Sequence, residues 1–233
     1  LAPGASLGGS RPKSGVVDTD GTLFIAKFPS RNDDYDMGAW EHVVLLLAKA
    51  SGISVADGYA RTFSTKWSTF LVRRFDRTAD QTRIHFASAM TLLGKMDGDG
   101  AQSGVSYLDI AKVISAGANP DADLPQLWRR IAFNVCVSNA DDHLRNHGFL
   151  LGKAGWVLSP AYDMNPVPYA KGLNLNKSEH SNALDLDLVI EVAPYFRIKT
   201  KDEAWRIALK IAKEVSAWRK VATGVGLRKS DQD

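Results

Sequence analysis

Two carboxylates and one amide in the second half of the chain are the side chains best suited to chemistry. Asp141 and Asn146 stand five residues apart in a polar run between two apolar segments, and Asp163 follows 17 residues later. This spacing is typical of loops in which the aspartate orients an attacking hydroxyl and the asparagine binds Mg²⁺. Mg²⁺ prefers oxygen ligands and fills its remaining positions with water and phosphate. The pattern therefore indicates phosphoryl transfer, with Asp163 as a second metal ligand.

The same segment allows two other interpretations. In the first, it is a solvated loop in which Asn139 and Asp142 cap neighbouring backbone groups. In the second, His143 and His147 bind a metal ion, with an aspartate as third ligand of a hydrolase. Such a histidine pair requires a helix through both residues, and Gly148 with the β-like segment after it disfavours one.

Lys27 is the candidate partner for a phosphate group. It ends an apolar strand, on the same face as Leu23 and Ile25, where an ammonium group needs an anionic partner. The alternative is an edge-strand lysine that discourages aggregation. Glu41, on the next predicted helix, is a candidate counter-ion for Lys27, or else an exposed glutamate on the helix surface.

Glycines near the start of the chain form a second candidate phosphate site. Gly8 and Gly9 precede a predicted hairpin, and Arg11 and Lys13 add positive charge beside them. Glycine lets backbone amides approach a phosphate closely. Two glycines before a strand also occur in ordinary turns, so the motif by itself is not specific. The sequence contains no Walker A motif.

The elements that must position these side chains follow from hydrophobic periodicity and turn residues. A small β-rich lobe is expected over residues 1–77 and a larger helical lobe over 78–233, an α+β fold. Strands are predicted over residues 14–17, 22–28, 59–62 and 69–75, a hairpin over 148–159, and helices over 36–51, 107–116, 124–137, 185–193 and 202–222.

Composition sets the broad class of protein. The chain has 233 residues, of which 45% are hydrophobic and 24% charged, and this excludes a disordered tail, a collagen-like fibre and a small disulfide scaffold. Cys136 is the single cysteine and the longest apolar run is too short to cross a bilayer, so we expect a soluble, cytoplasmic protein without a membrane partner. The net charge of +3 gives no broad nucleic-acid signature.

Five short segments carry a resemblance to one family. They are GSRPK (9–13), KFP (27–29), RRFDR (73–77), NADDHLRN (139–146) and AYD (161–163). In this order they resemble the HipA-like bacterial toxin kinases over residues 6–168. The resemblance implies an ATP- and Mg²⁺-dependent serine/threonine protein kinase with a divergent two-lobed kinase fold.

The resemblance also implies a role for particular residues. Asp141 would be the catalytic base, Asn146 and Asp163 the metal ligands, and Lys27 the contact to the α- and β-phosphates. Ser6 matches a serine whose autophosphorylation keeps the glycine loop out of the ATP site, although an ordinary loop serine fits equally well. The implied nucleotide-binding residues are Gly8, Gly9, Ser10, Arg11, Pro12, Lys13, Lys27, Arg73, Arg74, Phe75, His143, Leu144, Arg145, Asn146, Tyr162 and Asp163.

Partners follow from the family as well. Its members are encoded with a helix-turn-helix antitoxin that binds operator DNA, and known substrates include aminoacyl-tRNA synthetases. Residues 199–229 hold nine Lys or Arg against three Asp or Glu, which suits an acidic partner or a DNA backbone, or else an ordinary solvated face. Two other functions stay open: a related small-molecule or lipid kinase, and a catalytically silent corepressor that binds the antitoxin.

The start of the chain departs from the family pattern. Members usually carry an additional N-terminal β subdomain, whereas this sequence begins with Leu1, inside the kinase core. We therefore expect either a fragment of a longer protein or a short-form toxin whose remaining part is a separate small protein.

Overall fold

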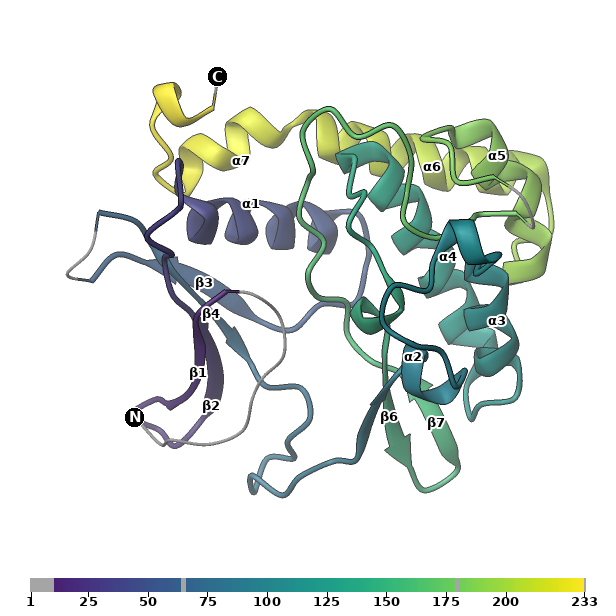
Figure 1. Ribbon diagram of the computed structural model, residues 1–233, viewed down its shortest axis with the longest axis horizontal. Helices are drawn as coiled ribbons and strands as arrows, with labels where there is room; N and C mark the ends of the chain where they lie inside the picture. Colours follow the sequence, from purple (N-terminus) through teal and green to yellow (C-terminus); the bar gives the residue numbers. More distant parts are fainter. Residues whose placement is uncertain (1–10, 64–65, 179–180, 233) are drawn as a thin grey trace.

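The chain folds into a small β-rich lobe beside a larger, mainly helical lobe (Figure 1). The computed structural model describes residues 11–63, 66–178 and 181–232. Ser6, Gly8, Gly9 and Ser10 lie outside these ranges, so the glycine loop and the candidate phosphorylation site stay predictions. Within the described part of the chain, no helix is both long and apolar enough to cross a lipid bilayer.

The small lobe is built on a four-stranded antiparallel sheet. Its strands are β1 (Lys13–Val17), β2 (Leu23–Lys27), β3 (Gly58–Arg61) and β4 (Thr69–Arg73), in the order β1-β2-β4-β3. The register places Lys13 directly opposite Lys27, so two lysines lie side by side at one end of the β1–β2 hairpin. Both predicted strand pairs of this lobe are present, because alternation and turn residues determine hairpins locally.

Helix α1 (Met37–Ala50) packs on this sheet and matches the helix predicted over 36–51. Asp36 is its N-cap and accepts a hydrogen bond from the Ala39 amide at 3.0 Å. The same carboxylate accepts bonds from the backbone amide and hydroxyl of Ser68 at 3.1 and 2.7 Å, which ties the start of α1 to the residue before β4. The cap therefore fixes both the helix start and its place on the sheet.

Gly38 allows the first turn of α1 to lie against the chain at Ser68. A Cβ atom at position 38 would lie 2.2 Å from the Ser68 carbonyl oxygen. We expect Gly38→Ala to lower the free energy of unfolding by about 1–3 kcal/mol, because backbone must shift to make room. Gly15→Ala is the control, since a Cβ there meets nothing within 4 Å. Urea denaturation measures both; a Gly38→Ala variant stabilised as helix propensity alone predicts would contradict the packing argument.

The larger lobe combines helices with a second, three-stranded antiparallel sheet. This sheet has the order β5-β6-β7, and the β6–β7 pair is the predicted hairpin. The strands of this lobe are β5 (Phe86–Ser88), β6 (Gly148–Gly152) and β7 (Gly155–Leu158). Its α-helices are α2 (Ala89–Leu92), α3 (Tyr107–Ser115), α4 (Pro120–Val137), α5 (Leu186–Val192), α6 (Lys201–Ser216) and α7 (Trp218–Gly224). Short 3₁₀ turns are η1 (Ala101–Ser103), η2 (Leu144–Asn146), η3 (Ala193–Phe196) and η4 (Lys229–Asp231).

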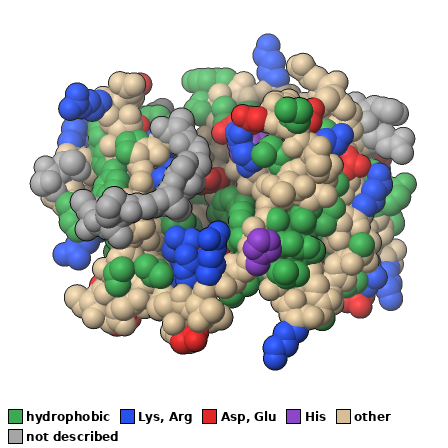
Figure 2. All heavy atoms as spheres, turned by 60° about the horizontal axis from the view of Figure 1, so that its bottom comes forward, with side chains coloured by type: hydrophobic (Ala, Val, Ile, Leu, Met, Phe, Trp, Pro, Cys, Tyr) green, Lys and Arg blue, Asp and Glu red, His purple; other side chains and the backbone are tan. Residues whose placement is uncertain are grey.

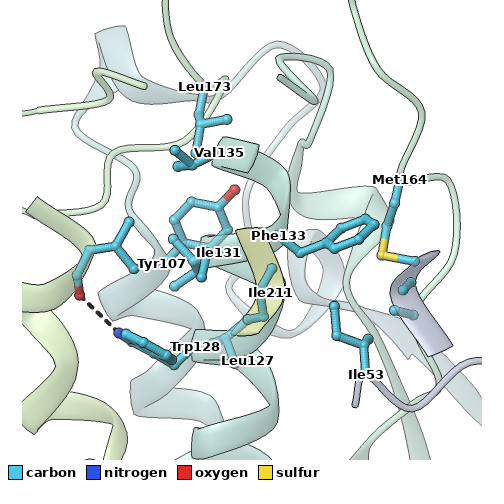
Figure 3. Packing of buried hydrophobic residues seen from close by; sticks show 14 of the residues in the cluster. Ile53, Tyr107, Leu127, Trp128, Ile131, Phe133, Val135, Met164, Leu173 and Ile211 are labelled. Atoms are coloured by element: carbon cyan, nitrogen blue, oxygen red, sulfur yellow. Dashed lines mark hydrogen bonds between the residues drawn. The ribbon is translucent and has the colours of Figure 1, made fainter. Parts of the chain in front are cut away.

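Helix α4 runs through the core of this lobe (Figure 3). Leu127, Trp128, Ile131 and Phe133 are all fully buried on it. The Trp128 indole satisfies its N–H by donating to the Val189 carbonyl at 2.9 Å, so the large ring is buried without an unpaired donor. The polar loop 138–147 starts directly at the end of this helix and is therefore anchored to the hydrophobic core.

Two predicted helix boundaries are wrong. Helix α4 begins at Pro120, four residues before the predicted start, because proline at a first helical position leaves no N–H unsatisfied. The single helix predicted over 202–222 is two helices, with a break at Ala217. Near the break the Ser216 hydroxyl donates to the Lys213 carbonyl at 2.7 Å, and α7 packs on α1.

Candidate active site

An ion-pair cluster joins the two lobes at Lys27. The Lys27 ammonium group lies 2.6 Å from Oε2 of Glu41 on α1 and also contacts Oδ1 of Asp163, from the loop after β7. The Lys27 and Glu41 side chains are only 12% and 5% exposed, so both charges depend on each other. The structure thus brings together the strand lysine, its candidate counter-ion and the later aspartate, from positions far apart in the sequence.

Burial and charge act against each other in this cluster. Burial alone would lower the pKa of Lys27, but the carboxylates of Asp163 and Glu41 outweigh it and raise that pKa. Burial raises the pKa of Glu41, although the Lys27 ammonium opposes it. Burial alone would also raise the pKa of Asp163, but the Lys27 ammonium outweighs burial and lowers that pKa. Lys27 is therefore positively charged and paired with two acids.

Lys13 and Arg11 add positive charge at the same side of the sheet. Burial lowers the pKa of Lys13; Asp163 opposes this shift and Lys27 reinforces it, which places Lys13 within electrostatic reach of the cluster. Arg11 is held by two hydrogen bonds to Asp33, at 3.0 and 2.6 Å. Its guanidinium is therefore already paired, whereas Lys13 is the cation better placed for an anionic ligand. Seen from below the view of Figure 1, the surface is hollowed between the lobes and carries acidic and basic side chains there (Figure 2).

The loop 138–147 presents Asp141 to solvent and keeps Asn146 buried. The amide nitrogen of Asn146 donates to the Asp141 carbonyl at 3.1 Å, and this bond fixes the spacing of the two residues. The phenol of Tyr162 donates to the Arg145 carbonyl at 2.6 Å. Because Tyr162 immediately precedes Asp163, this bond ties the loop to the acid that contacts Lys27.

The residues fit a Mg²⁺ ion bound together with phosphates. Since the Asn146 nitrogen is committed as a donor, its amide oxygen is the atom left for a metal, and Asp163 supplies a carboxylate. No group of three or more His, Cys, Asp or Glu suited to a metal occurs in the described residues. Two protein oxygens supplemented by phosphate and water are the usual arrangement for Mg²⁺, whereas a structural zinc site needs more protein ligands.

Three aromatic rings line the connection between the lobes. Phe75 stacks on Tyr162 with ring centroids 5.7 Å apart, and Phe86 packs against Phe75 at 6.1 Å. Asp76 is held by Arg74 at 2.5 Å and Arg77 at 2.7 Å, which fixes the segment just after β4. The segment 73–75, which the resemblance assigns to nucleotide binding, therefore lies against the loop that carries Asp163, while Arg73 at its start is exposed.

Sequence reasoning missed a buried hydrogen-bond network around Asp142. This residue is 2% exposed, and its Oδ2 accepts bonds from the Tyr107 hydroxyl at 2.5 Å and the Asn134 amide at 2.7 Å. The same oxygen lies 2.9 Å from Nε2 of His147. Asp142 is thus no surface cap; it binds the loop to α3, α4 and the start of β6. No signal in the sequence distinguishes Asp142 from Asp141, because the partners of Asp142 lie on distant segments.

The remaining residues of the loop have structural partners. His143 lies 3.3 Å from Nη2 of Arg145, whose side chain also pairs with Asp97 at the surface. Leu144 is buried in the hydrophobic cluster. Residues 144–146 form a single 3₁₀ turn, so no α-helix runs through His143 and His147 and the zinc interpretation is wrong.

The fold and this cleft define a protein of the kinase-like class. Two solved structures share the fold, both at low sequence identity. The toxin HipA of Shewanella oneidensis, solved with HipB and operator DNA, aligns over 98% of this chain and 61% of its own with a TM-score of 0.75 and 19% identity. The Helicobacter pylori proinflammatory kinase CtkA aligns over 97% of this chain and 96% of its own with a TM-score of 0.60 and 13% identity.

Sequence comparison identifies the family. The model of the HipA-like C-terminal domain matches residues 5–221, and the chain belongs to this family. A Haemophilus influenzae protein named "Putative kinase" is 30% identical over 192 residues, which cover 73% of this chain and 55% of that protein. The serine/threonine-protein kinase toxin HipA of Shewanella oneidensis is 24% identical over 190 residues, 71% of this chain and 44% of the toxin. The chain thus spans about half the length of these relatives.

Proposed function

We propose that the chain is an ATP- and Mg²⁺-dependent serine/threonine protein kinase that acts as the toxin of a toxin–antitoxin pair. The observation that carries this proposal is the contact of Lys27 with both Glu41 and Asp163 at the junction of the lobes. A lysine held by a helix glutamate beside a metal-binding aspartate is the arrangement that protein kinases use for nucleotide phosphates. Family membership supports the same activity.

Each side chain then has a task in phosphate transfer. Lys27, kept charged by its two acids, would bind the α- and β-phosphates, and Glu41 would hold the ammonium group in place. Asn146 and Asp163 would hold Mg²⁺, which would offset charge on the phosphates. Asp141, which is exposed to solvent, would accept the proton of the substrate hydroxyl and orient its oxygen for attack. The backbone of residues 73–75 and the rings of Phe75 and Tyr162 border the adenine.

The partners are proposed from the family. The solved HipA relative binds HipB and operator DNA. For this chain we propose a helix-turn-helix antitoxin as protein partner, with DNA reached through it. The substrate is proposed to be a protein of the translation machinery such as an aminoacyl-tRNA synthetase, with autophosphorylation at Ser6.

Thermal unfolding with a non-hydrolysable ATP analogue tests the nucleotide site. We expect analogue and Mg²⁺ together to raise the Tm, because a ligand at 100 times its Kd adds about 2.7 kcal/mol, and either alone to do little. Lys27→Met should lose most of this shift, whereas Lys153→Met, in the exposed β6–β7 turn, should keep it. No shift for the unmodified protein in any combination would refute the nucleotide site. Transfer of phosphate to sugars or lipids but not to protein would refute the protein-kinase assignment.

A further inference from the structure

The C-terminal tail of the chain packs on the helix that carries Glu41. Helix α7 lies beside α1 (Figure 1), and the rings of Trp218 and Trp40 are 5.5 Å apart. Beyond α7, the Trp40 indole donates to the Asp231 carbonyl at 3.3 Å. The last part of the larger lobe thus reaches back to the small lobe and packs on α1, with Trp40 among the residues that it contacts.

The tail segment is itself fixed in place. The Asp231 carboxylate accepts two hydrogen bonds from Arg228, at 2.9 and 3.1 Å. The Gln232 amide donates to the Leu227 carbonyl at 2.9 Å, and Leu227 is 6% exposed. The carbonyl that Trp40 reaches therefore belongs to an ordered turn anchored on the hydrophobic cluster.

Trp40 and Glu41 are neighbours on α1 but face different partners. Consecutive residues of an α-helix point about 100° apart, so one position can face α7 while the next faces Lys27. Because the helix backbone is stiff, a rotation of α1 that moves the Trp40 ring also moves the Glu41 carboxylate. Displacing Glu41 would leave Lys27 paired with Asp163, and Asp163 is the carboxylate proposed to bind the metal.

We propose that the C-terminal tail positions Glu41, with Trp40 and Trp218 as positioning residues of the Lys27–Glu41 pair. This inference rests on the proposed kinase function. It assigns to residues 218–231 a role in nucleotide use, although none of them lies in the cleft. A change in how residues 218–231 pack on α1 would then move Glu41 relative to Lys27.

A double-mutant cycle on phosphate transfer tests the coupling. We expect Trp218→Ala to lower kcat/KM for ATP about tenfold, and Trp218→Phe, which keeps a ring against Trp40, to stay within about twofold. In a Glu41→Gln background, Trp218→Ala should cost little more, because the group it positions is already lost. Trp205→Ala is the matched control, since Trp205 on α6 also packs half-buried on the core but makes no ring contact or hydrogen bond with α1 in the described structure.

Two results would overturn the proposal. One is a fold loss in kcat/KM from Trp218→Ala that is as large in the Glu41→Gln background as in the wild type. The other is an equal fold loss in kcat/KM from Trp205→Ala. If Trp218→Ala does not fold, Trp40→Phe, which removes the hydrogen bond to Asp231 and keeps a smaller aromatic ring beside Trp218, takes its place in the cycle. Hydrogen exchange of the amides over residues 41–50 gives a readout independent of activity: faster exchange in Trp218→Ala than in Trp205→Ala supports the coupling, and unchanged exchange refutes it. A wild-type chain that transfers no phosphate would refute the proposed function and leave this exchange test intact.

Discussion

Replacing Asp141 by asparagine is expected to lower the rate of phosphate transfer by about 10²–10⁴-fold, because the amide cannot accept the proton of the attacking hydroxyl. Asp141 is exposed and contributes its backbone carbonyl, not its carboxylate, to the bond with Asn146. The loop should therefore keep its conformation in the variant. Incorporation of labelled phosphate into protein, with saturating ATP and Mg²⁺, measures the loss.

Two comparisons make this prediction specific. Asp187→Asn removes a carboxylate from the exposed side of α5 and should leave the rate unchanged. The thermal shift with ATP analogue and Mg²⁺ should persist in Asp141→Asn, since nucleotide binding is assigned to other residues. An Asp141→Asn variant that retains more than about a third of the wild-type rate would rule out the proposed base, because general-base catalysis contributes far more than that.

Replacing Asp142 by alanine is expected to destabilise the fold by about 3–5 kcal/mol, the usual consequence of removing one partner from a buried charged network. Tyr107, Asn134 and His147 would each lose their acceptor in a region where all three are almost fully buried. That loss is a large part of the free energy of unfolding of a typical domain, about 5–15 kcal/mol. Asp142→Asn keeps an oxygen at this position and should lose less. Urea denaturation at pH 7 compares the two variants.

The pH dependence gives a second measurement of the same network. Burial acts to raise the pKa of Asp142, but His147 and the hydrogen bond from Tyr107 outweigh it and lower that pKa below 3.8. A lowered folded-state pKa means that the stabilisation is present above about pH 4 and is lost as the pH falls through the folded-state value. The stability difference between wild type and Asp142→Asn should therefore shrink below about pH 4. A difference that stays constant down to pH 3 would show that Asp142 is not ionised in the fold.

Local signals made the small lobe predictable. Helix α1 was expected over 36–51 because an apolar stripe and Gly52 lie within or next to the segment itself, and the structure adds Asp36 as its N-cap. The ion pair at Lys27 was partly predictable as well, since a lysine on an apolar strand face must find an anion. The sequence could offer Glu41 as that anion, but only the packing of α1 on the sheet decides between a buried and a solvated glutamate.

The unpredicted features depend on contacts between distant segments. Which of Asp141 and Asp142 faces inward is decided by Tyr107, 35 residues upstream, and by Asn134 on α4. The break at Ala217 has a helix-favouring residue at its centre, so local propensity argues against it and packing on α1 prevails. Strand β5 has only three residues and pairs with β6 about 60 positions later, too short for alternation to mark it.

The backbone at Asp163 restricts which side chains can occupy the position. Its φ angle is +54°, in the left-handed region that only glycine, asparagine and aspartate adopt readily. A glutamate there would carry the same charge but would meet a conformational penalty, and a glycine would relieve the backbone at the loss of the carboxylate. Backbone conformation and charge are thus two independent reasons why aspartate suits this position.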